Sequence, residues 1–167
     1  MTKTQVHAEI DGSHATITFS TDDGLNVLST DVLHSFGAAI AKVRKDPNVR
    51  TTVVQAKGKV FIAGADIKEM AAFKSDDAHE YATLGQSIMS DLASLPSITV
   101  AAIQGAALGG GLEVTLACDF RVAVKSAKLG LPEVTLGLIP GWGGVIRLTQ
   151  LIGPAKAKRI FLSAAPV

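Results

Sequence analysis

The chain has 167 residues, of which 47% are hydrophobic, so it can bury one sizeable core, and its length favours one domain. Its 16 basic and 15 acidic residues leave a formal net charge of +1, too small a field to make nucleic acid or a membrane surface the main partner. The single cysteine, Cys118, excludes an internal disulfide, and no run reaches the roughly 18 consecutive apolar residues of a membrane span, so we expect a cytoplasmic protein.

The N-terminal part predicts a hairpin and a helix. Apolar and polar residues alternate over 6–10 and over 15–19 on either side of Asp11-Gly12, which indicates an antiparallel β-hairpin. Apolar residues recur at helical spacing from Thr30 to Val43, and Ser29 or Thr30 is placed to cap the start of this helix.

The middle of the chain alternates predicted strands and helices. Thr51 to Ala56 is short, apolar and β-branched, which predicts a strand buried on both faces. The elements expected after it are a loop over 57–66, a helix over 77–95, a strand over 98–103, a glycine-rich turn over 105–111, a short helix over 112–118 and a strand over 120–124. This alternation predicts an α/β domain with a largely parallel sheet. Residues 130–144 form an irregular apolar segment, which is typical of functional loops, and helical periodicity resumes at Val145.

One candidate anion site follows a predicted strand. The segment Gly105-Ala-Ala-Leu-Gly-Gly-Gly-Leu-Glu113 places three adjacent glycines at the start of a helix. Glycine permits positive φ and close approach of a ligand to the main chain, and a helix start presents unpaired N–H groups. An oxyanion would bind well there. Taken alone, the segment also suits phosphate binding or close helix–strand packing.

Four motifs occur in order along the chain: Phe61-Ile-Ala-Gly-Ala-Asp-Ile-Lys-Glu-Met70, the glycine-rich run with Glu113 and Cys118-Asp119, Leu131-Pro-Glu133, and Ile139-Pro-Gly141. Together they resemble the enoyl-CoA hydratase/isomerase (crotonase) family, over almost the whole chain from the first hairpin onward. The resemblance implies an α/β fold of the crotonase-like (ClpP/crotonase) type, a spiral of β-β-α units. It also implies that residues 1–167 form the core domain and that the chain stops before the family's C-terminal helical region.

The resemblance further implies the catalytic groups. The main-chain N–H groups of Ala65 and Gly110 would hold the thioester oxygen of an acyl-CoA. Glu113 would help to activate a water molecule, and Glu133 would supply a proton to Cα. The alternative interpretation of each glutamate is a solvated surface residue. If the two are buried together, burial and mutual repulsion should raise at least one pKa.

The substrate-binding residues implied by the resemblance are Ala63, Gly64, Ala65, Asp66, Ile67, Lys68, Gly109, Gly110 and Trp142. Trp142 is expected to line the acyl pocket, with simple packing as the alternative. The scattered histidines lack metal-ligand spacing, so no metal is expected. No cofactor is expected either, because coenzyme A is part of the substrate.

The presence of both carboxylates favours a hydratase, since isomerases of this family generally work with the carboxylate at the Glu133 position alone. We therefore expect the chain to add water to a trans-2-enoyl-CoA. The alternatives are an enoyl-CoA isomerase and a non-catalytic acyl-CoA-binding or assembly subunit. A homo-oligomer, trimer or hexamer, is the further partner that the resemblance implies. Acyl chain length and pathway cannot be read from these residues.

Overall fold

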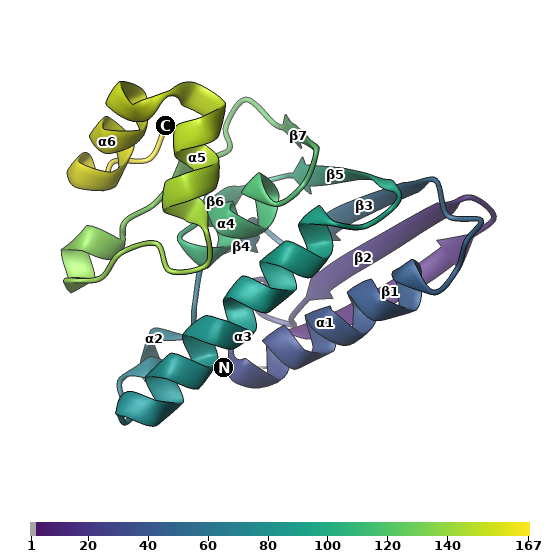
Figure 1. The fold of residues 1–167 in the computed structure, drawn as a ribbon, viewed down its shortest axis with the longest axis horizontal. Coiled ribbons are helices and arrows are strands. Elements are labelled where there is room, and N and C mark those ends of the chain that lie inside the picture. Colours follow the sequence, from purple (N-terminus) through teal and green to yellow (C-terminus); the bar gives the residue numbers. More distant parts are fainter. Residues whose placement is uncertain (1–2) are drawn as a thin grey trace.

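The computed structural model describes residues 3–167. Its larger sheet has five strands in the order β1-β2-β3-β5-β7 (Figure 1). These strands are β1 (Gln5–Asp11), β2 (His14–Ser20), β3 (Thr51–Ala56), β5 (Ile98–Ile103) and β7 (Phe120–Ala123). The β1–β2 pair is antiparallel and every other pair is parallel, so the predicted hairpin and largely parallel sheet are confirmed.

A second, parallel sheet has the order β4-β6-β8. Its strands are β4 (Val60–Ile62), β6 (Ala106–Leu108) and β8 (Leu129–Gly130). The predictions of a plain loop over 57–66 and a plain turn over 105–111 were therefore wrong, because strands of two or three residues are too short to show a hydrophobic period.

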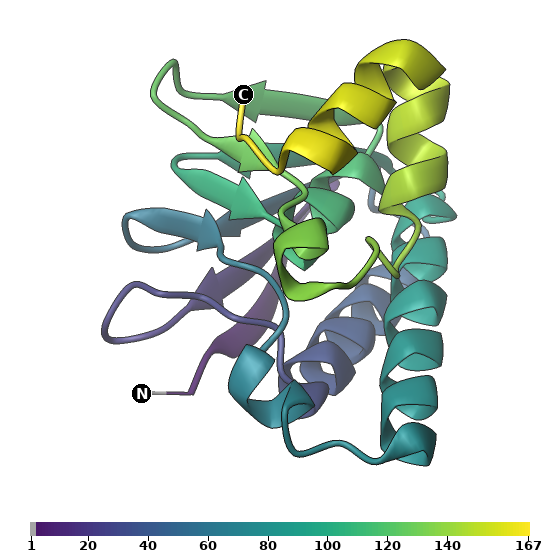
Figure 2. The ribbon, with the colours of Figure 1, turned by 90° about the vertical axis from the view of Figure 1, so that its left-hand side faces the viewer.

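The two sheets together show the repeating unit of the fold. Strands β3, β5 and β7 join the larger sheet, and the strand that follows each of them joins the smaller one (Figure 2). Helical segments follow each such strand pair, which gives a spiral of β-β-α units. The predicted fold class is thus confirmed.

The helices are α1 (Thr30–Arg44), α2 (Ile67–Met70), α3 (Ser75–Ala93), α4 (Gly110–Leu116), the 3₁₀ helix η1 (Glu133–Leu136), α5 (Gly144–Ile152) and α6 (Pro154–Ser163). The ends of α1, α3 and α4 lie within two residues of their predicted positions, whereas α6 was not predicted. Ser29 caps α1, because its Oγ accepts a hydrogen bond from the N–H of Val32 at 3.3 Å.

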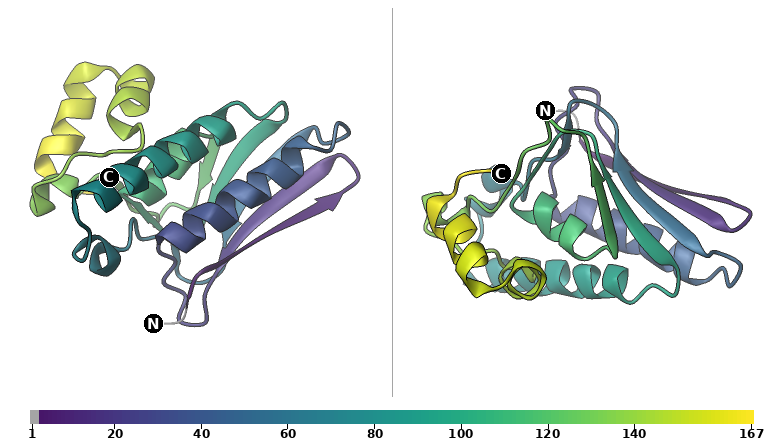
Figure 3. Two further views of the ribbon diagram at one scale, coloured as in Figure 1. Left: turned by 60° about the horizontal axis from the view of Figure 1, so that its bottom comes forward. Right: turned by 90° about the horizontal axis from the view of Figure 1, so that it is seen from above.

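Helices α1 and α3 lie along one face of the larger sheet (Figure 3). Thr52 and Val54 are buried in β3, whereas the alternate residues of this strand are only half-buried. The prediction that this strand is buried on both faces was therefore wrong, because helices cover only one face of the sheet. Cys118 is buried as predicted, and burial raises the pKa of its thiol to about 12. No helix within residues 3–167 is both long and apolar enough to cross a bilayer.

Candidate active site

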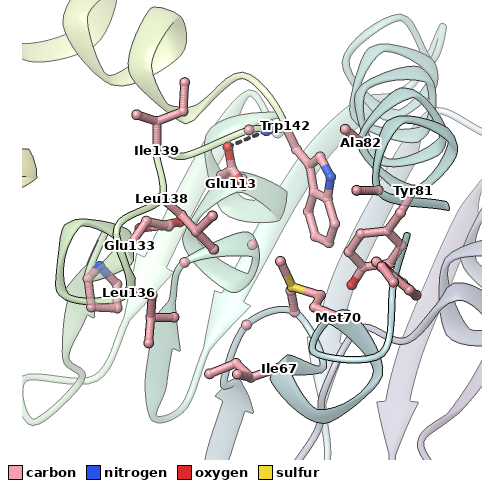
Figure 4. Close-up of a pocket in the computed structure, with 18 of the residues that line it drawn as sticks. Ile67, Met70, Tyr81, Ala82, Glu113, Glu133, Leu136, Leu138, Ile139 and Trp142 are labelled. Carbon is pink, nitrogen blue, oxygen red and sulfur yellow. Dashed lines mark hydrogen bonds between the residues drawn. The ribbon is translucent and has the colours of Figure 1, made fainter. Parts of the chain in front are cut away.

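A cavity of about 280 Å³ brings most of the predicted site residues together. It lies between α2 and α3 on one side and α4, η1 and the loop before α5 on the other (Figure 4). The predicted residues that line it are Ala63, Gly64, Ala65, Ile67, Gly109, Gly110, Glu113, Glu133 and Trp142. Asp66 and Lys68 are not among the lining residues.

Two main-chain N–H groups face this cavity without an acceptor. Each belongs to a residue that follows a glycine with positive φ: Gly64 (124°) precedes Ala65, and Gly109 (52°) precedes Gly110. Residues with a Cβ atom rarely adopt such φ values, so the glycine at each position allows the main chain to take the direction observed here. Neither the Ala65 nor the Gly110 N–H donates a hydrogen bond within the described part of the chain. Both remain available for an oxygen atom of a ligand.

The Ala65 N–H is oriented by the main chain of Leu28. The N–H of Leu28 donates to the carbonyl of Gly64 at 2.9 Å, and the N–H of Asp66 donates to the carbonyl of Leu28 at 3.2 Å. Both neighbours of Ala65 are therefore paired with the same residue, which directs the Ala65 N–H to the opposite side. The carboxylate of Asp66 caps α2 by accepting two of its first N–H groups, so Asp66 supports the donor without lining the cavity.

Glu113 is a buried carboxyl held by the main chain. Its side chain projects from α4, and the residue is only 2% exposed. Oε1 accepts hydrogen bonds from the N–H groups of Trp142 (2.7 Å) and Gly144 (2.8 Å). Burial raises the pKa of Glu113 to about 7, the negative charge of Glu133 adds to this effect, and the two N–H donors oppose it. Glu113 is therefore poised to exchange a proton near neutral pH.

Glu133 opens η1 and lies beside Gly109. A Cβ atom on Gly109 would come within 3.2 Å of Glu133 Oε1, which places this carboxyl directly against the residue before Gly110. Its Oε2 is buried and has no hydrogen-bond partner among residues 3–167. Burial also raises the pKa of Glu133. Glu113 is thus buried and Glu133 half-buried, whereas the alternative interpretation expected two solvated side chains; the catalytic role of each stays a prediction.

Several lining residues were not predicted. They come from the end of α2 and its following turn, from one side of α3, and from the loop around η1; they are Met70, Phe73, Ala78, Tyr81, Ala82, Pro132, Leu136, Leu138, Ile139 and Gly141. The periodicity of residues 77–95 predicted the helix that carries Tyr81 and Ala82. It gave no sign of which residues on the helix would meet a cavity, because that depends on what packs against the helix.

Two carboxyls with raised pKa values and two unpaired main-chain donors thus lie around one cavity of the fold. Residues 9–167 match the model of the enoyl-CoA hydratase/isomerase family, and the chain belongs to this family.

Individual relatives agree with this assignment. A probable enoyl-CoA hydratase from Bacillus subtilis is 43% identical over 143 residues, which are 85% of this chain and 55% of the relative. A mitochondrial methylglutaconyl-CoA hydratase from Mus musculus is 44% identical over 142 residues, 84% of this chain and 45% of the relative. The crystal structure of an enoyl-CoA hydratase from Bacillus anthracis has a TM-score of 0.92 at 34% identity, covering 98% of this chain and 64% of that one. The chain thus spans about half the length of the curated relatives it matches.

Proposed function

We propose that the chain adds water to a trans-2-enoyl-CoA by syn addition, giving a 3-hydroxyacyl-CoA. The observation that carries this proposal is the placement of Glu113 and Glu133, both with raised pKa values, in the cavity that also presents two unpaired N–H donors. The two relatives described above are both named hydratases, which supports the same reaction.

The two N–H donors would act on the thioester. Its carbonyl oxygen accepts hydrogen bonds from Ala65 and Gly110, and it gains negative charge as the thioester becomes enolate-like. Donors fixed by the fold stabilise this charge more than the neutral ground state, by about 3 kcal/mol for each donor. Because main-chain N–H groups are the donors, the role depends on backbone geometry.

The two carboxyls would divide the proton transfers. Glu113, deprotonated, takes a proton from the water, whose oxygen forms a bond to C3. Glu133, protonated, gives its proton to Cα, and the double bond becomes single. A proton returned from Glu113 to Glu133 restores the starting state. Burial together with mutual repulsion favours a pair that holds one proton between them. Coenzyme A is part of the substrate, and this scheme uses no separate cofactor.

Hydration is tested by the loss of absorbance of the conjugated thioester when purified protein meets a 2-enoyl-CoA. Glu133→Gln should lower kcat by at least about a hundredfold and leave CoA affinity nearly unchanged, because the amide keeps the shape but has no proton to give. Glu9→Gln, an exposed carboxylate on β1, is the matched control and should behave like the parent.

The other outcomes assign the alternatives. Conversion of a 3-enoyl-CoA to the 2-enoyl form, without hydration, would make the chain an isomerase. Binding of acyl-CoA with neither conversion would make it a non-catalytic acyl-CoA-binding subunit. Either result would overturn the hydratase proposal.

We also propose that the chain forms a homo-oligomer in the cytoplasm, with the trimer or hexamer of the family as the expected state. The open face of the larger sheet supports self-association, since Ile98 (52% exposed), Phe120 (59%) and Val122 (64%) lie on it. Light scattering should show a species larger than one chain, and Val122→Lys should shift it toward the monomer. A parent protein that stays monomeric throughout the micromolar range would contradict the proposal.

A further inference from the structure

The indole of Trp142 fills the space between α3 and α4. A Cβ atom on Gly85 of α3 would lie 2.2 Å from the indole Nε1, and one on Gly110 of α4 would lie 2.4 Å from Cζ3. Both distances are far shorter than van der Waals contact. The nitrogen-containing edge of the ring therefore lies directly on α3 and the opposite edge lies directly on α4, and only glycine on either side leaves room for it.

Two further rings extend this barrier. The Tyr81 ring centroid lies 5.2 Å from that of Trp142 with an interplanar angle of 70°, and the Phe73 ring lies 5.2 Å from Tyr81 at 64°. These edge-to-face contacts are favourable. Figure 4 shows Trp142 and Tyr81 on one side of the cavity and Glu113 and Glu133 on the other. We call Phe73, Tyr81 and Trp142 the aromatic wall.

The position of Trp142 in this wall is fixed by its main chain. Its N–H donates to Glu113 Oε1 at 2.7 Å, and its carbonyl accepts a hydrogen bond from Arg147 Nη1 at 2.9 Å. The main chain of Trp142 therefore fixes the Glu113 carboxyl, and the same residue carries the indole. The wall lies at a set distance from the carboxyl that would activate the water.

We infer that Trp142 determines specificity by restricting the acyl group to a short chain, an inference that rests on the proposed function. The indole packs directly against Gly110, so a thioester oxygen bound to the Gly110 N–H would lie close to the indole. The carbons beyond the reacting double bond would then lie against the aromatic wall, because Trp142 of this wall also donates its N–H to Glu113. The cavity volume of about 280 Å³ also lies just below the range of about 300–1,000 Å³ that is typical of ligand pockets.

The same acyl group should be uncharged. No lysine, arginine or histidine belongs to the described residues that line the cavity, whereas two glutamates do. Arg147 does not line it, and its guanidinium is engaged with the carbonyl of Trp142. A second carboxylate at the far end of the acyl group would find no cationic side chain among these lining residues and would meet the negative charge of two glutamates, which disfavours its binding.

Calorimetric titration with saturated thioesters tests this inference. The parent should bind butanoyl-CoA at least tenfold more tightly than octanoyl-CoA. Succinyl-CoA, with a four-carbon acyl group that ends in a carboxylate, should bind at least tenfold more weakly than butanoyl-CoA. Trp142→Leu should raise the affinity for octanoyl-CoA relative to butanoyl-CoA by tenfold or more, since each newly buried methylene contributes about fourfold. Trp142→Phe, with a shorter ring, should give an intermediate ratio.

Ile139→Ala is the matched control. Ile139 lines the cavity but is 77% exposed, so its truncation should weaken both thioesters in similar proportion. If Trp142 served packing alone, Trp142→Leu would lower the affinities for butanoyl-CoA and octanoyl-CoA and the melting temperature together. An unchanged ratio of the two affinities in Trp142→Leu would therefore overturn the inference. If Trp142→Leu does not fold, the ratio in Trp142→Phe decides. Saturated thioesters cannot be hydrated, so this binding assay is independent of the hydration assay with a 2-enoyl-CoA. A shifted affinity ratio in Trp142→Leu, combined with no hydration of the 2-enoyl-CoA by the parent, would refute the proposed function and leave the role of Trp142 standing.

Discussion

Glu113→Gln should stabilise the protein at alkaline pH although it removes a carboxylate proposed to act on water. The pKa of Glu113 is about 7 in the folded state, raised chiefly by burial, and near 4.5 when the chain unfolds. Between these values the folded protein holds more protons than the unfolded chain. Its stability must therefore fall as pH rises through this window, and the loss is complete above about pH 7.

The size of this loss follows from the two pKa values. The difference between 4.5 and about 7 corresponds to about 3 kcal/mol in unfolding free energy. Glu113 is only 2% exposed, so screening by solvent is small. Glutamine has no charge to lose and keeps an oxygen that accepts from Trp142 and Gly144. The stability of Glu113→Gln relative to the parent should thus improve by about 3 kcal/mol between pH 4 and pH 8.

Urea denaturation of both proteins at pH 4 and pH 8 measures this change. Glu133 titrates in both, so its own contribution largely cancels. Glu9→Gln, which changes an exposed carboxylate, should follow the parent at both pH values. If the difference between Glu113→Gln and the parent is the same at the two pH values to within about 0.5 kcal/mol, the buried carboxyl does not carry the pKa assigned to it.

Three further changes test the support of the site. Gly110→Ala should lower the melting temperature and the hydration rate together, because its methyl group would lie 2.4 Å from Trp142 Cζ3; thermal melts and kinetics on one sample would show this. Asp66→Ala removes the cap of α2 and should cost about 1 kcal/mol in urea denaturation. Asp119→Ala leaves the Thr99 N–H without its 2.8 Å acceptor and should cost about 1–3 kcal/mol, with the hydration rate of the folded protein unchanged.

The longer helices and strands could be predicted because the spacing of their apolar residues indicates which side of each element is buried. The helix from Thr30 to Arg44 buries every third or fourth residue against the sheet, and the same spacing is visible in the sequence. The predicted bounds of β3 and β5 coincide with the observed ones. Strands β4, β6 and β8 span at most three residues, which is too short for a hydrophobic period. They pair with segments distant in the sequence, so no local pattern predicts them.

The site divides in the same way. The order and spacing of the motifs predicted Ala65, Gly110, Glu113 and Glu133, since the residue types themselves carry the resemblance, and all four line one cavity. Only the tertiary structure decided that the carboxyl of Glu113 accepts main-chain N–H groups 29 and 31 residues further along the chain.

The aromatic wall is also a product of tertiary structure. Trp142 stood out in the sequence, but Gly85 and Tyr81, which fix its ring from α3, carried no signal of their own. A local pattern reports whether a residue is buried. It does not report which distant element buries it, because that contact exists only once the helices have packed on the sheet.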